Sequence, residues 1–345
     1  MPKKYYLSHN YMAANFKITT LGLLRGFAVL AVCFRHLTKP LLVAGHFTIF
    51  DLFYKYGLYG VQVFFVISGF IIPYSLYKAD YKVGHYFQFL WKRVLRLHPP
   101  YIIALVLTFV IAFASYKMRH LPNPESISTF IQSLFYLHAP ADNPVFWTLR
   151  IEAEYYLFIG LFFIPLMRFP TATLLVGIPA LLMLGHTPLI DHIWLIRYIV
   201  FFLIGIIGFM IYTRQGNLTI QWSLLVLLIA CSFIYHETGA AVFSLITIAV
   251  ILFFRIPLHS MLEFPGEISY SLYLIHFPIG IKVINLLLRV TDPSYKWALF
   301  FLALAICVAA GWLFWKFIEK PSARLSTKVK YGNRKVTFAN FDVKN

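Results

Sequence analysis

The stretch LGLLRGFAVLAVCFRHL, residues 21–37, sets the fold class. It has nearly the length of the roughly 20 apolar residues that a helix needs to cross a bilayer, and Arg25 interrupts it. Comparable stretches follow almost back to back. Of the 345 residues, 60% are hydrophobic and 12% are charged, and the mean hydropathy of +0.74 excludes a soluble globular domain. The sequence therefore predicts an all-α, polytopic integral membrane protein.

Hydropathy and interruptions by proline, glycine and charge predict a bundle of ten transmembrane helices. The expected ranges are 20–37, 57–77, 98–116, 150–167, 171–185, 193–213, 219–236, 239–256, 267–289 and 295–318. We expect a cytoplasmic N-terminal segment, a membrane domain and a basic cytoplasmic tail, over residues 1–19, 20–320 and 321–345 respectively. No cleaved signal peptide is evident, so the first span is expected to serve as the insertion signal.

The basic residues lie in short loops and in the tail rather than on one soluble face, although the formal net charge is +17. This distribution argues against a nucleic-acid partner and agrees with the positive-inside rule. Lys78, Lys82 and Lys92 fall on one predicted side, and the alternate loops are poorer in Lys and Arg. We therefore expect both termini in the cytoplasm and the lipid bilayer as a partner.

Motifs of several other protein classes are missing from the sequence. It contains no phosphate-binding P-loop, no Gly-x-Ser-x-Gly elbow and no dinucleotide fingerprint. Cys33, Cys231 and Cys307 lie singly in apolar stretches, which gives no disulfide framework and no metal-ligand spacing. These patterns argue against ATP-driven transport, serine-esterase chemistry and metal catalysis.

Arg25 and His36 share one face of the first span, because the helical repeat places them about 16 Å apart along the axis on the same side. A cation in the bilayer costs roughly 2.5 to 3.5 kcal/mol even on the lenient insertion scale, so Arg25 needs a partner or a water-filled cavity. The alternatives are that Arg25 snorkels to the inner headgroups and that His36 is an interface residue. The pairing suits a long anionic ligand that enters from the cytoplasm.

The segment WKRVLRLHPPY places Arg93 and Arg96 on one helix face at the cytoplasmic side. Two guanidiniums in this arrangement can bind phosphate bidentately, better than ammonium groups would. A positive-inside cluster explains the pair equally well. Pro99 and Pro100 are tolerated in a first helical turn and therefore predict that the third span begins there.

Two further segments place small or polar residues inside apolar spans. In GVQVFFVISGFIIP, Ser68 and Gly69 allow the close approach of a helix or a ligand. In SYSLYLIHFP, Tyr273 and His276 lie on one polar stripe. An intramembrane histidine indicates a functional site, although a hydrogen-bonded structural histidine is the alternative.

The segment FWTLRIEAEYYLF brings aromatic and acidic residues to the predicted outer entry of the fourth span. Trp147, Glu152 and Tyr156 offer a stacking face and hydrogen-bonding groups for a sugar. An aromatic belt with salt-bridged glutamates is the competing interpretation. Glu152 and Glu154 face different sides of a helix, which makes them a poor catalytic pair.

Taken in order, these segments resemble the membrane-bound acyltransferase family 3, whose best-known members O-acetylate bacterial surface polysaccharides. The resemblance extends from about Leu21 to Arg324. Its marks are the Arg-x10-His pair, the Phe-Phe-x-x-Ser-Gly-Phe block, the Arg-x-x-Arg pair, WTLRIEAEYYL, SYSLYLIHFP and Glu319-Lys320-Pro321. The sequence departs from the family pattern where Glu-Ala-Glu follows Ile151 in place of Glu-Glu-Gln, which leaves the acceptor open.

The resemblance implies an O-acyltransferase, expected to be an O-acetyltransferase, in the inner (cytoplasmic) membrane. Its donor substrate would be acetyl-CoA, with no tightly bound cofactor. Its acceptor would be a hydroxyl of a surface polysaccharide or lipid-linked glycan, and glycan-assembly proteins are possible partners. Two alternatives stay open: another acyl donor such as succinyl-CoA, and a transporter or flippase that moves a lipid-linked sugar without changing it.

The same resemblance implies a role for each residue. The donor site would use Arg25, Arg93, Arg96, Ser68 and Gly69. The acceptor and the central cavity would use Trp147, Glu152, Tyr156, Tyr273 and His276. In catalysis, Arg25 would guide the donor arm, and His36 would act as general base on the acceptor hydroxyl or carry the acyl group briefly.

Overall fold

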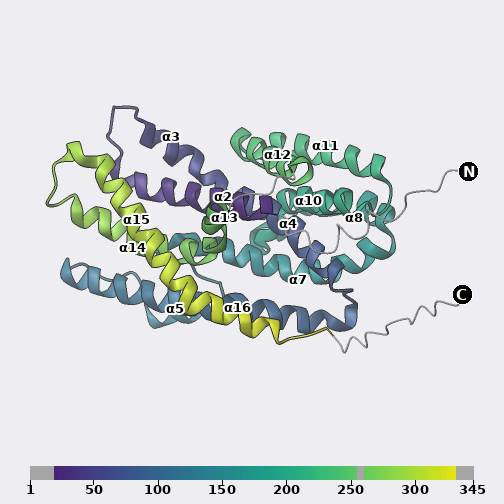
Figure 1. Ribbon diagram of the computed structural model, residues 1–345, viewed down its shortest axis with the longest axis horizontal. Coiled ribbons are helices and arrows are strands. Elements are labelled where there is room, and N and C mark those ends of the chain that lie inside the picture. Colours follow the sequence, from purple (N-terminus) through teal and green to yellow (C-terminus); the bar gives the residue numbers. More distant parts are fainter. Residues whose placement is uncertain (1–18, 255–259, 332–345) are drawn as a thin grey trace, which may run out of the picture.

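The computed structural model describes residues 19–254 and 260–331, and in these ranges the chain forms helices and no β-strand (Figure 1). The α-helices are α2 (Thr19–Thr38), α3 (Ile49–Tyr56), α4 (Gly60–Lys78), α5 (Tyr86–Met118), α6 (Ile127–Leu134), α7 (Trp147–Arg168), α8 (Pro170–Leu184), α9 (Leu189–His192), α10 (Trp194–Thr213), α11 (Leu218–Tyr235), α12 (Thr238–Phe253), α13 (Ser260–Glu267), α14 (Ser269–Leu287), α15 (Lys296–Phe314) and α16 (Lys320–Thr327). Short turns are η1 (Lys39–Leu41), η2 (Gly57–Tyr59), η3 (Val83–His85), η4 (Pro144–Phe146), η5 (Pro293–Tyr295) and the π-turn η6 (Trp315–Glu319). The predicted all-α class is confirmed.

Seven helical segments of the described chain are long and apolar enough to cross a bilayer. They are Thr20–Leu41, Ile49–Lys78, Val83–Met118, Trp194–Thr213, Leu218–Tyr235, Ser269–Leu287 and Lys296–Thr327. The other three predicted spans overlap α7, α8 and α12, which fall outside this set. The chain is therefore a multi-pass membrane protein, whereas ten crossings and cytoplasmic termini stay predictions.

Glycines bring the backbones of α4 and α10 into contact. A Cβ atom on Gly69 would lie 2.2 Å from the carbonyl oxygen of Phe202, and one on Gly205 would lie 2.2 Å from that of Val66. No side-chain carbon fits at such a distance, so only glycine permits this approach. In lipid, close packing of this kind replaces the hydrophobic effect as the force that joins helices.

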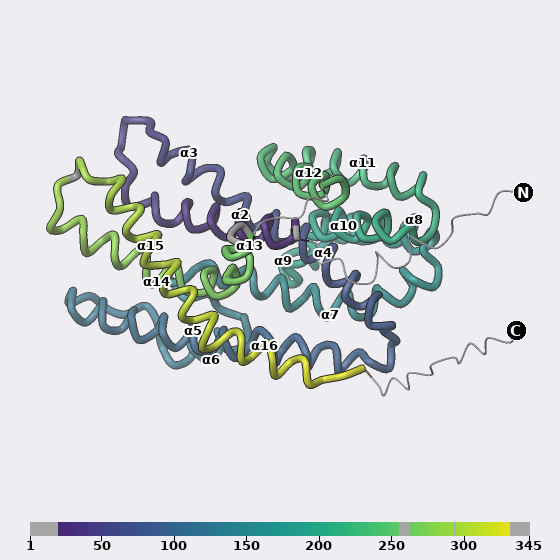
Figure 2. The backbone as a smooth tube through the Cα atoms, in the orientation of Figure 1, coloured from purple at the N-terminus to yellow at the C-terminus, as the bar shows by residue number. Residues whose placement is uncertain are grey.

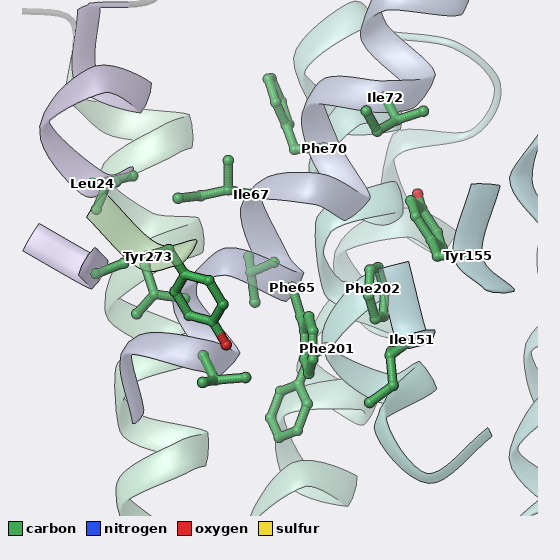
Figure 3. Packing of buried hydrophobic residues seen from close by; sticks show 14 of the residues in the cluster. Leu24, Phe65, Ile67, Phe70, Ile72, Ile151, Tyr155, Phe201, Phe202 and Tyr273 are labelled. Carbon is green, nitrogen blue, oxygen red and sulfur yellow. The ribbon is translucent and has the colours of Figure 1, made fainter. Parts of the chain in front are cut away.

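Aromatic rings fill the space beside this contact. The ring centre of Phe202 on α10 lies 4.2 Å from that of Tyr155 on α7 and 4.8 Å from that of Phe65 on α4 (Figure 3). Tyr155 and Phe202 are fully buried. The stacked rings therefore join α7 to the α4 and α10 pair and fix the position of the helix that carries Glu152.

Helix α5 is longer than predicted and contains Pro99 and Pro100, where its start was expected. A proline lacks the N–H that would bond to the carbonyl four residues earlier, so the pair leaves the carbonyls of Leu95 and Arg96 without helical partners. The expected start was wrong because Ser322 Oγ donates to both carbonyls, at 2.6 and 3.2 Å. A donor from outside the helix thus allows α5 to continue.

The C-terminal segment, defined as η6 and α16 with the residues up to Tyr331, lies along the first half of α5 (Figure 2). Ser322 and Ser326 are buried there. Tyr331 stacks on His85 with ring centres 5.5 Å apart. The structure therefore places residues 321–331, which were expected in a tail, against the membrane domain. Residues 332–345 and nearly all of the predicted N-terminal segment lie outside the described residues.

Candidate active site

One cavity of about 520 Å³ brings together most of the predicted site residues. Helices α2, α4, α5, α7, α10, α13 and α14 line it, together with the C-terminal segment. The predicted residues in the lining are Arg25, Ser68, Arg93, Arg96, Glu152, Tyr156 and Tyr273. Those outside it are His36, Gly69, Trp147 and His276. The structure thus places seven of the predicted residues in the cavity lining and leaves the other four, including both histidines, outside it.

Three guanidiniums from two helices line the cavity: Arg25 from α2, and Arg93 and Arg96 from α5. Arg93 donates from Nη2 to Ser75 Oγ at 3.1 Å, and its guanidinium carbon lies 5.5 Å from the ring centre of Tyr156. In the described part of the chain its buried Nε has no hydrogen-bond partner. Because buried donors are normally paired, this cluster is prepared to bind an anion.

Lys92 and Tyr331 line the cavity at the end that carries these arginines. Lys92 Nζ lies 5.3 Å from the ring centre of Tyr331. Burial raises the pKa of the Tyr331 hydroxyl above its ordinary value, so the phenol is neutral at physiological pH. A basic and aromatic edge therefore adjoins the arginines, on the side that the charge pattern predicts to be cytoplasmic.

The two glutamates of α7 have different surroundings: Glu152 lines the cavity, whereas Glu154 bonds to the start of α10. Glu152 lines the cavity and accepts a hydrogen bond from the hydroxyl of Tyr156. Glu154 forms an ion pair with Arg150 at 3.0 Å and accepts a hydrogen bond from the N–H of Leu195 at 2.7 Å, in the first turn of α10. The departure from the family pattern at Glu154 is therefore structural, because this carboxylate caps a helix N-terminus.

Glu319 lines the same cavity, although residue patterns alone did not single it out. It ends the π-turn η6 and is 7% exposed. Its Oε2 accepts hydrogen bonds from the backbone N–H of Ser271 at 3.1 Å and from Ser271 Oγ at 2.5 Å. This carboxylate caps the N-terminus of α14, which carries Tyr273 and His276. A lone acidic residue that ends an apolar run was the signal that could have identified it.

Tyr273 lines the cavity and contacts residues of η4, α7 and α4. Its hydroxyl donates to the carbonyl of Val145 at 2.9 Å and lies 2.7 Å from Thr148 Oγ1, and its ring centre is 6.0 Å from that of Phe64. Figure 3 shows this phenol among the buried apolar residues of the core. The Tyr273 ring also contacts His276, with ring centres 5.9 Å apart.

His36 and His276 form a pair next to Tyr273, with ring centres 5.4 Å apart. His276 is fully buried, and its Nδ1 lies 3.1 Å from the Leu272 carbonyl oxygen and 2.8 Å from that of Tyr273. Because a carbonyl can only accept, Nδ1 carries the proton and Nε2 is left as an acceptor. Within the described residues this Nε2 has no partner. Two imidazoles in contact can hold and pass a proton.

The comparisons with known proteins agree with this geometry. The model of acyltransferase family 3, described as an acyltransferase domain, matches residues 18–316. The chain belongs to this family. The resemblance inferred from the sequence is confirmed, and the protein is a membrane acyltransferase. Searches of curated proteins and of solved structures found no match.

Ser68 and Gly69 of the acyltransferase are neighbours in α4 but have different surroundings. Ser68 lines the cavity. Gly69 is buried and faces the backbone of Phe202 on α10. Helix packing therefore accounts for Gly69, as the alternative interpretation of the sequence proposed.

Replacing Gly69 by alanine is expected to destabilise the protein without changing its affinity for a donor. The new Cβ would meet backbone that cannot give way, and such overpacking costs about 1–3 kcal/mol. Thermal unfolding in detergent should show a Tm several degrees lower. Gly84→Ala is the matched control, because nothing lies within 4 Å of a Cβ there. An unchanged Tm in Gly69→Ala would contradict the packing role.

Trp147 of the acyltransferase packs against another aromatic residue rather than into the cavity. Its ring centre lies 5.3 Å from that of Tyr198 on α10. Glu152 and Tyr156, which were predicted with it to hold a sugar, line the cavity that the arginines share. The structure therefore does not bring these three residues together in one binding surface.

Proposed function

We propose that this acyltransferase transfers an acetyl group from acetyl-CoA, which enters from the cytoplasmic side of the inner membrane, to a hydroxyl of a surface polysaccharide or lipid-linked glycan. The observation that carries the proposal is one cavity lined both by three arginines and by Tyr273, whose ring contacts the histidine pair. This combination of groups suits a donor that carries both anionic phosphates and a reactive thioester.

The dimensions of the cavity support a donor of this kind. Its volume of about 520 Å³ lies within the range of small-molecule sites, roughly 300–1,000 Å³. Arg25, Arg93 and Arg96 would bind the phosphates bidentately. The pantetheine arm would then extend along the apolar wall of α4, past Ser68, toward Tyr273.

The proposed reaction is general-base catalysis by His36. His36 removes the proton from the acceptor hydroxyl, and the oxygen attacks the thioester carbonyl. The tetrahedral intermediate then collapses, the C–S bond breaks, and the CoA thiolate takes the proton from His36. The thioester reaches His36 when the Tyr273 side chain leaves its position against Thr148 and Val145.

Glu152 and Tyr156 take a place on the donor side in this scheme. The Tyr156 ring lies under the guanidinium of Arg93, and its hydroxyl holds Glu152. Together they orient the arginine that binds phosphate. The acceptor glycan approaches from the side of His36, where the surrounding groups are the rings of His276 and Phe277.

Calorimetric titration of the purified protein with acetyl-CoA tests the proposal. We expect saturable binding that weakens as salt screens the arginines. Binding should be followed by transfer, seen by mass spectrometry as one acetyl group added to the surface glycan only in cells that carry the gene. A flippase for a lipid-linked sugar would give no acetyl-CoA binding. Preference for succinyl-CoA over acetyl-CoA in the same titration would replace the acetyl group of the proposal.

A further inference from the structure

We propose that Ser322 is a positioning residue that sets the place of Arg96 in the donor site. The inference rests on the proposed function, because it assumes that Arg96 binds the donor's phosphates. Ser322 lies in α16, more than two hundred residues from Arg96 in sequence, yet the two are in hydrogen-bond contact through the Arg96 backbone.

The contact follows from the two prolines of α5. Pro99 and Pro100 cannot donate to the carbonyls of Leu95 and Arg96, which a regular helix would satisfy. Ser322 Oγ supplies the missing donor to both, at 2.6 and 3.2 Å. The single O–H hydrogen is thus shared between the carbonyl of Leu95, at the shorter distance, and that of Arg96, the residue that carries the guanidinium.

A second hydroxyl strengthens the same turn. Tyr270 of α14 donates to the carbonyl of Leu97 at 2.8 Å. Three successive carbonyls of α5, from Leu95 to Leu97, thus accept hydrogen bonds from side chains of other helices. The direction in which α5 presents Arg96 is consequently set by α14 and α16 together.

The C-terminal segment is also a wall of the donor cavity. Glu319, Ser326 and Tyr331 line it along with Arg96. Ser322 is 4% exposed, so water does not replace its hydroxyl when that group is removed. Loss of the hydroxyl leaves two partly buried carbonyls without this donor, and the turn must shift to find another. Displacement of the guanidinium follows from that shift.

The test measures the dissociation constant of acetyl-CoA by calorimetry on the full-length protein in detergent. We expect Ser322→Ala to raise this Kd about three- to tenfold, and we expect kcat at saturating donor to stay near wild type. Ser322→Thr keeps the hydroxyl and should restore wild-type affinity. Ser232→Ala is the matched control, since Ser232 in α11 is equally buried, bonds the Ile229 carbonyl and lies away from the cavity.

A double-mutant cycle separates positioning of Arg96 from general support of the fold. Arg96→Ala keeps the carbonyl that Ser322 contacts but removes the guanidinium. If Ser322 acts through Arg96, Ser322→Ala will change the Kd little in the Arg96→Ala background. An additive loss in the double variant overturns the proposal. If Ser322→Ala does not fold, the pair Ser322→Thr and Ser322→Val, which have nearly the same shape, gives the same comparison.

The outcomes distinguish this inference from the proposed function. No acetyl-CoA binding by the wild-type protein removes the proposed function and the inference with it. Wild-type binding together with an unchanged Kd in Ser322→Ala removes only the inference. A Kd that rises equally in Ser322→Ala and Ser322→Thr also overturns it, because the hydroxyl would then be irrelevant.

Discussion

Replacing His36 by alanine is expected to lower acetyl transfer by about two to four orders of magnitude while leaving the Kd of acetyl-CoA unchanged. The two effects are separate because His36 lies outside the lining of the donor cavity and yet contacts His276, which in turn contacts Tyr273 in the lining. It can therefore act on the reacting groups without helping to bind the donor.

The measurement is steady-state transfer combined with calorimetric titration of the same preparation. His236→Ala is the matched control: that ring also packs in the helical bundle, 4.6 Å from the centre of Phe201, but lies far in sequence from the proposed chemistry and outside the cavity. We expect near wild-type transfer from it. Full activity in His36→Ala would remove this residue as the base, and lost donor binding would show that the cavity extends to it.

Replacing Arg25 by alanine is expected to weaken acetyl-CoA binding roughly ten- to hundredfold, since hydrogen bonds to charged groups contribute about 1.5–3 kcal/mol. Arg25 lines the cavity with Arg93 and Arg96, so the phosphates lose one of three guanidiniums. Much of the transfer rate should return when the donor is saturating, because Arg25 is remote from the histidine pair. The effect is thus expected in the donor's KM more than in kcat.

Arg25→Lys and Arg197→Ala complete this experiment. The lysine variant keeps the charge but loses bidentate geometry, and it should fall between wild type and Arg25→Ala. Arg197 is exposed and pairs with Asp191 at 3.4 Å on the surface, so its removal should leave the Kd unchanged. Wild-type affinity in Arg25→Ala would mean that Arg25 serves the membrane interface instead, as the snorkelling alternative holds.

Part of the site could be predicted from the sequence, because some of its residues are charged although they lie in or next to an apolar span. Arg25 lies in an apolar stretch and therefore needs a partner or a cavity inside the helix bundle. The structure shows that it lines the cavity. Arg93 and Arg96 are about one helical turn apart, so their proximity can be predicted from the sequence alone. The helical repeat could not reveal that Tyr273 lines the cavity whereas His36 lies outside its lining.

The structural roles of Glu319 and Glu154 could not be predicted from the sequence, because both form hydrogen bonds with distant segments. Glu319 caps α14 through Ser271, and Glu154 caps α10 through Leu195. Each carboxylate accepts a hydrogen bond from a backbone N–H in the first turn of another helix. The position of the glutamate in the sequence therefore does not indicate which helix it caps.

The sequence by itself determined the all-α membrane class, the family and the arginine pair, because hydropathy and short spacings act within one helix. Only the tertiary structure decided that α5 continues through Pro99 and Pro100 and that Gly69 packs rather than binds. The physical reason is the same in both cases. The α5 carbonyls need a hydrogen-bond donor from another helix, and Gly69 packs against the backbone of another helix. Which helix lies there depends on the tertiary fold and not on the local sequence.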